Sequence, residues 1–197
     1  MTVKKHLRGV IAGLVCILIV VGYYYYLSNR DTKTTQESQE LSTIAKITTK
    51  NLDDSYPKTP REVVKLYNEI LKCYYNEDCT DEEIEALAGQ ARKLMDEELL
   101  EQNPKDQYLI ALKMDIQNYK DAKRTISRSD VCDSSEITYK TVKGSECAYV
   151  GASYFMKEEN GYIKSYEQYV LRKDDSGNWK ILAYKLIDGN GDNIENE

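Results

Sequence analysis

The hydrophobic pattern of this 197-residue chain changes its period at about Thr125. Before that position, apolar residues recur every three or four places, which is the spacing of an amphipathic helix. After it, β-branched and aromatic residues alternate with polar ones, the pattern of strands that bury one face. Helices followed by a long run of strands predict an α+β domain with an antiparallel sheet.

Three helices are predicted in the first part of this domain, each with its own start signal. Thr59 and Thr80 each precede a glutamate by three residues, which is the pattern of a capping box. Asn103-Pro104 marks the third start, because proline is favoured at the beginning of a helix. The positions expected to be buried are Val63, Tyr67, Ile70, Leu71, Tyr74, Ile84, Leu87, Ala88, Ala91, Leu94, Met95, Leu109, Leu112, Ile116 and Tyr119.

The second part is predicted to form four strands and a further edge strand, over residues 136–142, 146–157, 162–173, 179–187 and 125–131. Asn160-Gly161 is a strong signal for a two-residue hairpin loop. With that loop, Glu159 faces Tyr162, and alternate residues of the two strands share one more apolar face. We expect this face to turn toward the helices.

The predicted register gathers a candidate ligand pocket. Tyr154, Glu167 and Tyr169 fall on the more apolar face, and continuing across the next turn puts Lys185 opposite Glu167. A glutamate and a lysine inside an apolar, concave sheet must pair or shift their pKa values. A register slip of one residue would turn all of these side chains into solvent, so a solvent-exposed placement is the alternative.

The order of elements over residues 59–188 resembles the nuclear transport factor 2-like superfamily, which includes SnoaL-like and ketosteroid-isomerase-like proteins. The stretch GNWKILAYKLID, residues 177–188, is similar to the usual last strand of that superfamily. The resemblance implies a cone-shaped domain, in which three helices pack on a curved antiparallel sheet of four to five strands. It also implies a bacterial, membrane-anchored protein and pairing of two copies through the sheet.

Members of that superfamily include enzymes and non-catalytic binding modules, so the resemblance does not decide the function. In its enzymes, an aspartate acts with a histidine or a tyrosine. This chain has one histidine, His6, near its start, which excludes a histidine-based triad or zinc site in the rest of the sequence. Glu167 or Asp115 would therefore have to be the catalytic base, and no cofactor is expected.

The uncharged apolar run over residues 10–27 is 18 residues long and predicts a transmembrane helix. Basic residues precede it, so the positive-inside rule keeps residues 1–9 in the cytoplasm and places the rest of the chain outside the cell membrane. A cleaved signal peptide or a lipoprotein using Cys16 would need small residues before the cut. Retention as a single-pass anchor is the preferred interpretation.

Residues 28–58 have the polar composition of a flexible stalk, in which Leu41, Ile44 and Ile47 are candidates for a short ordered segment. Residues 189–197 are predicted to be a solvated acidic tail. The first thirty residues carry four basic side chains and no acidic ones, so the net charge of −6 corresponds to −10 on the remainder. A nucleic-acid partner is therefore not expected.

Four cysteines follow the predicted membrane segment, Cys73, Cys79, Cys132 and Cys147. An even number of cysteines in an exported domain allows disulfides, and we predict Cys73–Cys79 and Cys132–Cys147. Four free thiols acting as small apolar side chains are the alternative. The paired short spacings of a zinc site are missing, so no metal site is expected.

These features favour a membrane-anchored, extracytoplasmic binding or assembly module without catalysis, whose partner is an unidentified protein or small molecule. Tyrosines at the open end of the cone would supply contact area and hydroxyl groups for that partner. A small hydrolase or isomerase of the ketosteroid-isomerase type is the second hypothesis. A spacer domain within an envelope complex is the third.

Overall fold

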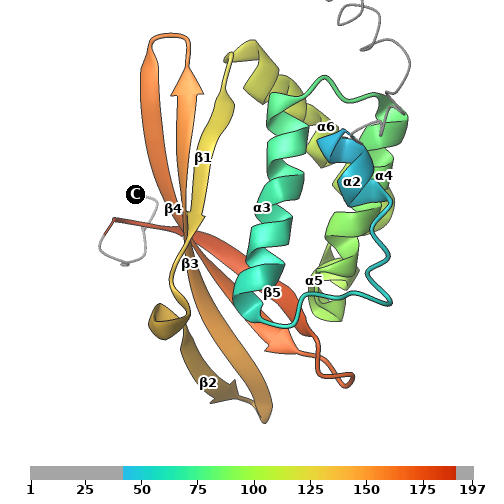
Figure 1. Ribbon diagram of the computed structural model, residues 1–197, viewed down its shortest axis with the longest axis vertical. Helices are drawn as coiled ribbons and strands as arrows, with labels where there is room; N and C mark the ends of the chain where they lie inside the picture. The colour runs from blue at the N-terminus through green and yellow to red at the C-terminus, as the bar shows by residue number, and fades with distance from the viewer. Residues whose placement is uncertain (1–41, 190–197) are drawn as a thin grey trace, which may run out of the picture. The chain divides into compact units, whose positions relative to one another are not determined.

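Five α-helices lie on one side of a curved, five-stranded antiparallel sheet in the computed structural model, which describes residues 42–189 (Figure 1). The helices are α2 (Thr43–Thr48), α3 (Pro60–Asn76), α4 (Asp81–Lys93), α5 (Glu97–Gln102) and α6 (Lys105–Asp121). The strands are β1 (Thr125–Val131), β2 (Thr138–Val142), β3 (Ser145–Glu158), β4 (Gly161–Lys173) and β5 (Trp179–Ile187). The predicted α+β class and the predicted edge strand, β1, are confirmed.

Strand β3 is the centre of the sheet. On one side of it lies β4, followed by β5, each antiparallel to its neighbour. On its other edge, β2 pairs with the first part of β3 and β1 with the second part. Figure 1 shows that the long strands bend strongly between these two parts. Helix α3 contacts β1, β3 and β5, so the sheet curves around this helix.

Local sequence signals place most of the helix starts. Thr59 accepts a hydrogen bond from the Glu62 backbone amide at 3.2 Å, and Glu62 accepts one from the Thr59 amide at 3.1 Å, which completes the predicted capping box of α3. The predicted box at Thr80 begins α4 in the same way. Helix α6 begins after Pro104. The pattern does not predict α5, which begins at Glu97 with Asp96 as its N-cap.

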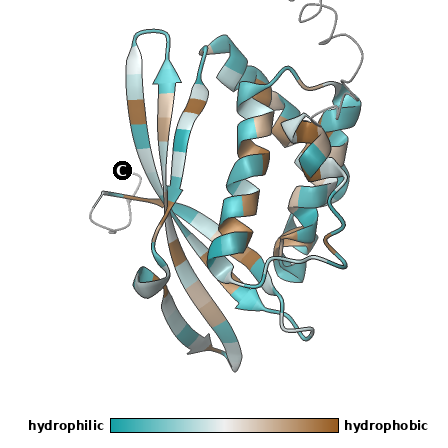
Figure 2. Ribbon diagram, in the orientation of Figure 1, coloured by the Kyte–Doolittle hydropathy of each residue, from teal (hydrophilic) through white to brown (hydrophobic). Residues whose placement is uncertain are grey.

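The predicted apolar faces of the helices meet the concave face of the sheet. Figure 2 shows apolar and polar residues alternating along the helices and strands. Burial of each large aliphatic side chain stabilises the fold by about 1.5–3 kcal/mol. The helices contribute Val63, Tyr67, Ile70, Tyr74, Leu87, Ala91, Leu94, Leu112 and Ile116, and the sheet contributes Ile126, Ala148, Val150, Ala152, Tyr154, Met156, Tyr169, Leu171 and Ile181.

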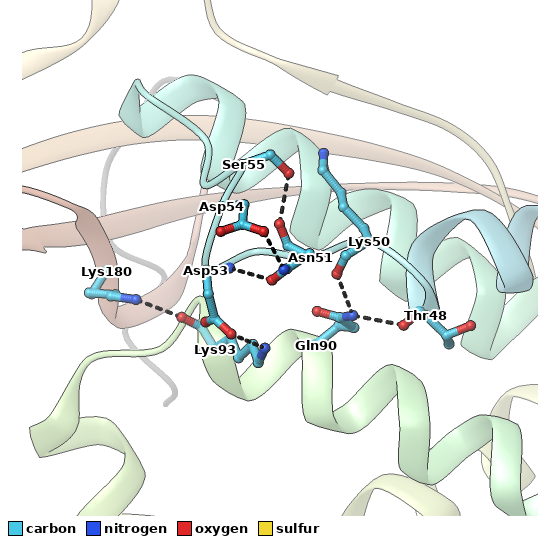
Figure 3. A network of polar contacts seen from close by, with 9 residues as sticks. All are labelled: Thr48, Lys50, Asn51, Asp53, Asp54, Ser55, Gln90, Lys93 and Lys180. Carbon is cyan, nitrogen blue, oxygen red and sulfur yellow. Dashed lines mark hydrogen bonds and ion pairs between the residues drawn. The ribbon is translucent and has the colours of Figure 1, made fainter.

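Residues 42–58, predicted to be part of the stalk, belong to the folded domain. The apolar residues of this segment are buried in the core: Ile44, Ile47 and Leu52. Gln90 of α4 donates hydrogen bonds to the backbone carbonyls of Thr48 at 3.0 Å and Lys50 at 2.9 Å (Figure 3). The short ordered segment expected around Ile44 and Ile47 is confirmed as α2, but the stalk prediction is wrong for residues 42–58, because their few apolar residues find partners on helices that are distant in the sequence.

The predicted leader, residues 1–9, and the predicted membrane segment, residues 10–27, lie outside the described residues. The same holds for the first part of the predicted stalk and for residues 190–197 of the predicted tail. Among the helices of residues 42–189, none is long and apolar enough to cross a membrane.

The segment before α5 joins the helices to the last two strands. The Ile181 amide donates a hydrogen bond to the Leu94 carbonyl, and the Asp96 amide donates one to the Ile181 carbonyl, both at 2.8 Å. Asp96 is only 4% exposed, and its carboxylate accepts a hydrogen bond from Nε of Arg172 at 3.0 Å. A buried carboxylate needs such a partner, because an unpaired charge in the interior costs several kcal/mol.

We predict that Asp96→Ala lowers the free energy of unfolding by about 3 kcal/mol, because it leaves Arg172 without its buried partner and removes the cap of α5. Urea denaturation measures the change. Glu98→Ala is the matched control: Glu98 contacts the same arginine at 3.2 Å from an exposed position, and its removal should cost less than about 1 kcal/mol. Equal losses for the two variants would contradict the role assigned to Asp96.

Candidate functional site

The β3–β4 hairpin places three of the predicted site residues on the concave face. Tyr154, Glu167 and Tyr169 stand opposite Ser165, Ala152 and Val150, respectively. The loop consists of residues 159 and 160, since Glu158 pairs with Gly161, so the predicted Asn160-Gly161 loop is wrong by one residue. The resulting partners differ from the predicted ones by two positions, and an even shift leaves every side chain on its predicted face.

Lys185 does not lie opposite Glu167, and this part of the prediction is wrong. A β-bulge separates the pairs Leu171–Ile181 and Val170–Ala183, so β5 carries one extra residue there. One extra residue exchanges the two faces of a strand. Lys185 therefore pairs with Gln168, and its neighbour Tyr184 points to the concave face and joins the cavity wall.

A chain of hydrogen bonds joins α3 to the sheet through two buried tyrosines. The Tyr154 hydroxyl donates to Oδ1 of Asn68 at 2.6 Å and lies 2.6 Å from the Tyr169 hydroxyl. The Tyr169 hydroxyl also lies 2.7 Å from Oε2 of Glu167. Tyr154 is 3% exposed and Tyr169 is 0% exposed. Burial raises the pKa of both tyrosines, so their hydroxyls stay protonated and are available as donors.

The three contacts in this chain need three donated hydrogens, and the two tyrosine hydroxyls supply only two. A neutral Glu167 supplies the third by donating to Tyr169. Alternatively, Asn68 supplies it when its amide is turned so that Nδ2 faces Tyr154. In the orientation described, Nδ2 of Asn68 is buried and has no hydrogen-bond partner among residues 42–189. The arrangement of hydrogens is thus linked to the protonation of Glu167.

Glu167 is a largely buried carboxylate, and no described basic side chain forms an ion pair with it. Burial raises its pKa above 4.5, and the hydrogen bond from Tyr169 offsets part of that rise. No ion pair to Glu167 is present among residues 42–189. A carboxyl group in this environment is suited to hold a proton or to bind a cationic group.

Asp115, the other predicted carboxylate, comes from α6 and lies on the same cavity wall as Glu167. It accepts a short hydrogen bond from the Tyr75 hydroxyl of α3. The Tyr75 ring in turn stacks on Tyr119, with 3.8 Å between the ring centroids. The structure therefore places both carboxylates that sequence reasoning proposed on one cavity wall, with Glu167 partly buried and Asp115 exposed to solvent.

The cavity between α3, α6 and the concave face has two adjoining parts, of about 350 Å³ and 470 Å³. Both parts are lined by Tyr67, Leu71, Tyr75, Asp115 and Tyr184. Six tyrosines in all line the smaller part, which also contains Glu167. Because Tyr184 is 52% exposed, the cavity opens to solvent at this side chain.

Two residues of the site show what sequence reasoning missed, Asn68 behind the cavity wall and Arg124 on it. Asn68 interrupts the apolar stripe of α3, four residues after Val64, and a polar residue in such a stripe is a sign of a buried hydrogen bond. Arg124, directly before β1, lines the cavity and is bound to Glu158, with 2.7 Å between Nε and Oε1. No local pattern marks Arg124, because its role depends on the end of a distant strand.

All four described cysteines are free thiols, so neither predicted disulfide is present. Cys132 lies opposite Gly151, while Cys147 is four residues away on the same strand, about 13 Å at 3.3 Å per residue. This separation excludes a Cys132–Cys147 bridge. Sγ of Cys79 lies 3.3 Å from the backbone carbonyl oxygen of Cys73, to which it donates a weak hydrogen bond.

The cavity offers aromatic surface, hydroxyl groups and two carboxylates, but little to bind a metal. Among residues 42–189, no three side chains of His, Cys, Asp or Glu are grouped closely enough to hold a metal ion. The chemical groups present are suited to a small organic molecule with an apolar body and a polar or charged group.

The fold and the cavity define an α+β domain with an open, tyrosine-lined pocket on the concave face of its sheet. The chain belongs to the family described as a domain of unknown function, DUF6715, whose model matches residues 1–184. A comparison with curated proteins found no match.

We predict that Glu167→Gln becomes progressively more stable relative to the native chain as the pH rises from about 4.5. Because burial raises the pKa of Glu167, its neutral form supports folding at low pH, and that support is lost as pH rises through the raised pKa. Urea denaturation across this pH range measures the difference. Glu146→Gln, which removes an exposed carboxylate bound to Lys173, controls for overall charge. A pH-independent difference would contradict the burial effect.

Proposed function

We propose that this protein is a non-catalytic binding module whose tyrosine-lined cavity takes a small organic ligand. The single observation that carries the proposal is the pre-arranged wall, in which Tyr154 and Tyr169 are held by hydrogen bonds between Asn68 and Glu167. Tyr67 packs edge-on against Tyr169, with 6.0 Å between the ring centroids. A wall fixed before the ligand arrives reduces the entropy lost on binding.

Tyr184 provides the test that the ligand binds in this cavity. It lines both parts of the cavity and packs on Tyr169 with 5.7 Å between ring centroids, yet it is half exposed. We predict that Tyr184→Ala weakens ligand binding about tenfold, which corresponds to about 1.4 kcal/mol. The change should cost less than about 1 kcal/mol of folding stability, because the side chain is not part of the closed core.

A ligand screen by thermal shift on the full-length chain, followed by calorimetric titration of the hits, measures this loss. Tyr162→Ala is the matched control, because Tyr162 is 62% exposed and stacks on Phe155 on the other face of the sheet. Ligands whose affinity survives Tyr184→Ala, or falls equally in Tyr162→Ala, would show that they bind elsewhere.

We further propose that residues 10–27 anchor the chain in the cell membrane, with residues 1–9 in the cytoplasm and the cavity domain outside. The support is the uncharged run of 18 residues behind a basic start. We predict that the full-length chain, expressed in bacterial cells, sediments with membranes and is released by detergent but not by high salt. Deletion of residues 10–27 should move it to the soluble fraction, and a chain that still sediments would contradict the anchor.

The proposed membership of the nuclear transport factor 2-like superfamily is supported by the order of helices and strands and by the strand curvature around α3. Pairing of two copies through the sheet is supported by the exposed Phe155–Tyr162 stack on the face away from the helices. The superfamily membership and the pairing of two copies are both proposals that rest on the resemblance.

A second candidate function is a small isomerase or hydrolase that uses Glu167 as the base and a neighbouring tyrosine as the hydrogen-bond donor. The raised pKa of Glu167 favours it, because a base with a pKa closer to neutral is more effective. The solvent-open side at Tyr184 favours binding without catalysis instead. Exchange of the α-hydrogens of a bound ketone in heavy water, lost in Glu167→Gln, would favour the enzyme.

A further inference from the structure

We infer that the cavity selects an organic cation, namely a protonated or quaternary amine carried on a small apolar body. This inference rests on the proposed binding function and specifies its ligand class. It starts from the charges on the cavity wall. Glu167 from β4 and Asp115 from α6 both line the part of about 350 Å³, and each accepts a hydrogen bond from one tyrosine.

Neither carboxylate has a basic partner within residues 42–189. Arg124 is the single basic residue on the wall of this part of the cavity, and it is already engaged. Its guanidinium binds Glu158 at the end of β3 and lies over the Tyr119 ring, 5.1 Å from the centroid. The cavity therefore has an excess of negative charge that no described side chain neutralises.

The aromatic lining is complementary to the same kind of ligand. Six tyrosines, from α3, α6, β3, β4 and β5, line this part of the cavity together with the partly buried Glu167 and the exposed Asp115. The face of an aromatic ring carries partial negative charge and attracts ammonium groups within about 6 Å. Rings and carboxylates together favour a cation whose charge is distributed over an organic group.

Other ligand charges fit less well. An anion would meet two carboxylates and the faces of electron-rich rings, and the wall offers it one arginine that is already paired. A neutral ligand would leave Glu167 largely buried and without a positive partner, which is the unfavourable state that raises its pKa. A bound ammonium group removes this penalty, because an opposite charge favours the ionised carboxylate.

Three probes of nearly the same shape separate the alternatives: benzylamine, benzyl alcohol and benzoate, which are cationic, neutral and anionic at neutral pH. Each is titrated into the full-length chain, and binding is followed by NMR at Tyr184 and the other cavity residues. We expect benzylamine to bind about tenfold more tightly than benzyl alcohol, because one hydrogen bond to a charged group contributes about that much to the affinity. We expect benzoate to bind least tightly of the three.

Variants of the two carboxylates test whether these residues cause the preference for a cation. Glu167→Gln keeps an acceptor for the Tyr169 hydroxyl but removes the charge, so it should reduce benzylamine affinity about tenfold and leave benzyl alcohol unchanged. Asp115→Asn should act in the same direction. Glu146→Gln removes a carboxylate on β3 that is bound to Lys173 outside the cavity, and it should change neither affinity.

The outcomes distinguish the inference from the proposed function. Equal affinities for benzylamine and benzyl alcohol, or benzylamine binding that survives Glu167→Gln and Asp115→Asn together, would overturn the cation preference and leave the binding cavity standing. If none of the three probes shifts the signals of the cavity residues, the proposed binding function is overturned, and the cation preference is overturned with it.

Discussion

The need to satisfy buried tyrosine hydroxyls governs the architecture of the site. Tyr154 and Tyr169 are buried where the sheet meets α3, and each brings a hydroxyl group into the interior. A buried hydroxyl without a partner costs about 1–3 kcal/mol, so the structure must supply polar groups at both ends of the pair. Asn68 supplies one end from α3, and Glu167 supplies the other from β4. The same bonds that join the helix to the sheet hold a carboxylate in the cavity.

The bulge in β5 determines which β5 side chain lies near the Glu167 carboxylate. Without the extra residue, alternation along β5 would put Lys185 beside Glu167, and the pair would neutralise itself. With it, Tyr184 lies on the cavity side and Lys185 pairs with Gln168 on the other face. A single inserted residue thus replaces a cation with an aromatic ring, and the cavity changes from an internally neutralised site to one that is complementary to an external positive charge.

Features that depend on local chemistry were predictable from the sequence. The capping boxes at Thr59 and Thr80 need only residues three places apart, and the face of Tyr154, Glu167 and Tyr169 needs only the period of a strand. Features that depend on distant partners were not. Ile44 and Ile47 indicated a short ordered segment, but their spacing did not show that this segment and Leu52 belong to the core of the domain, where α2 packs on α3 and α4. The bulge likewise has no glycine or proline to mark it, so Lys185 was misplaced.

The direction of the hydrogen-bond chain connects the protonation of Glu167 to α3. A neutral Glu167 would donate to Tyr169 and Tyr169 to Tyr154, so that all three contacts, including the one from Tyr154 to Oδ1 of Asn68, would be satisfied. When Glu167 is ionised, all three are satisfied only if the direction reverses, with Nδ2 of Asn68 donating first. Because a cation in the cavity favours the ionised form, its arrival would favour the turned amide. The hydrogen-bond chain therefore links the charge of Glu167 to the amide orientation of Asn68 on α3.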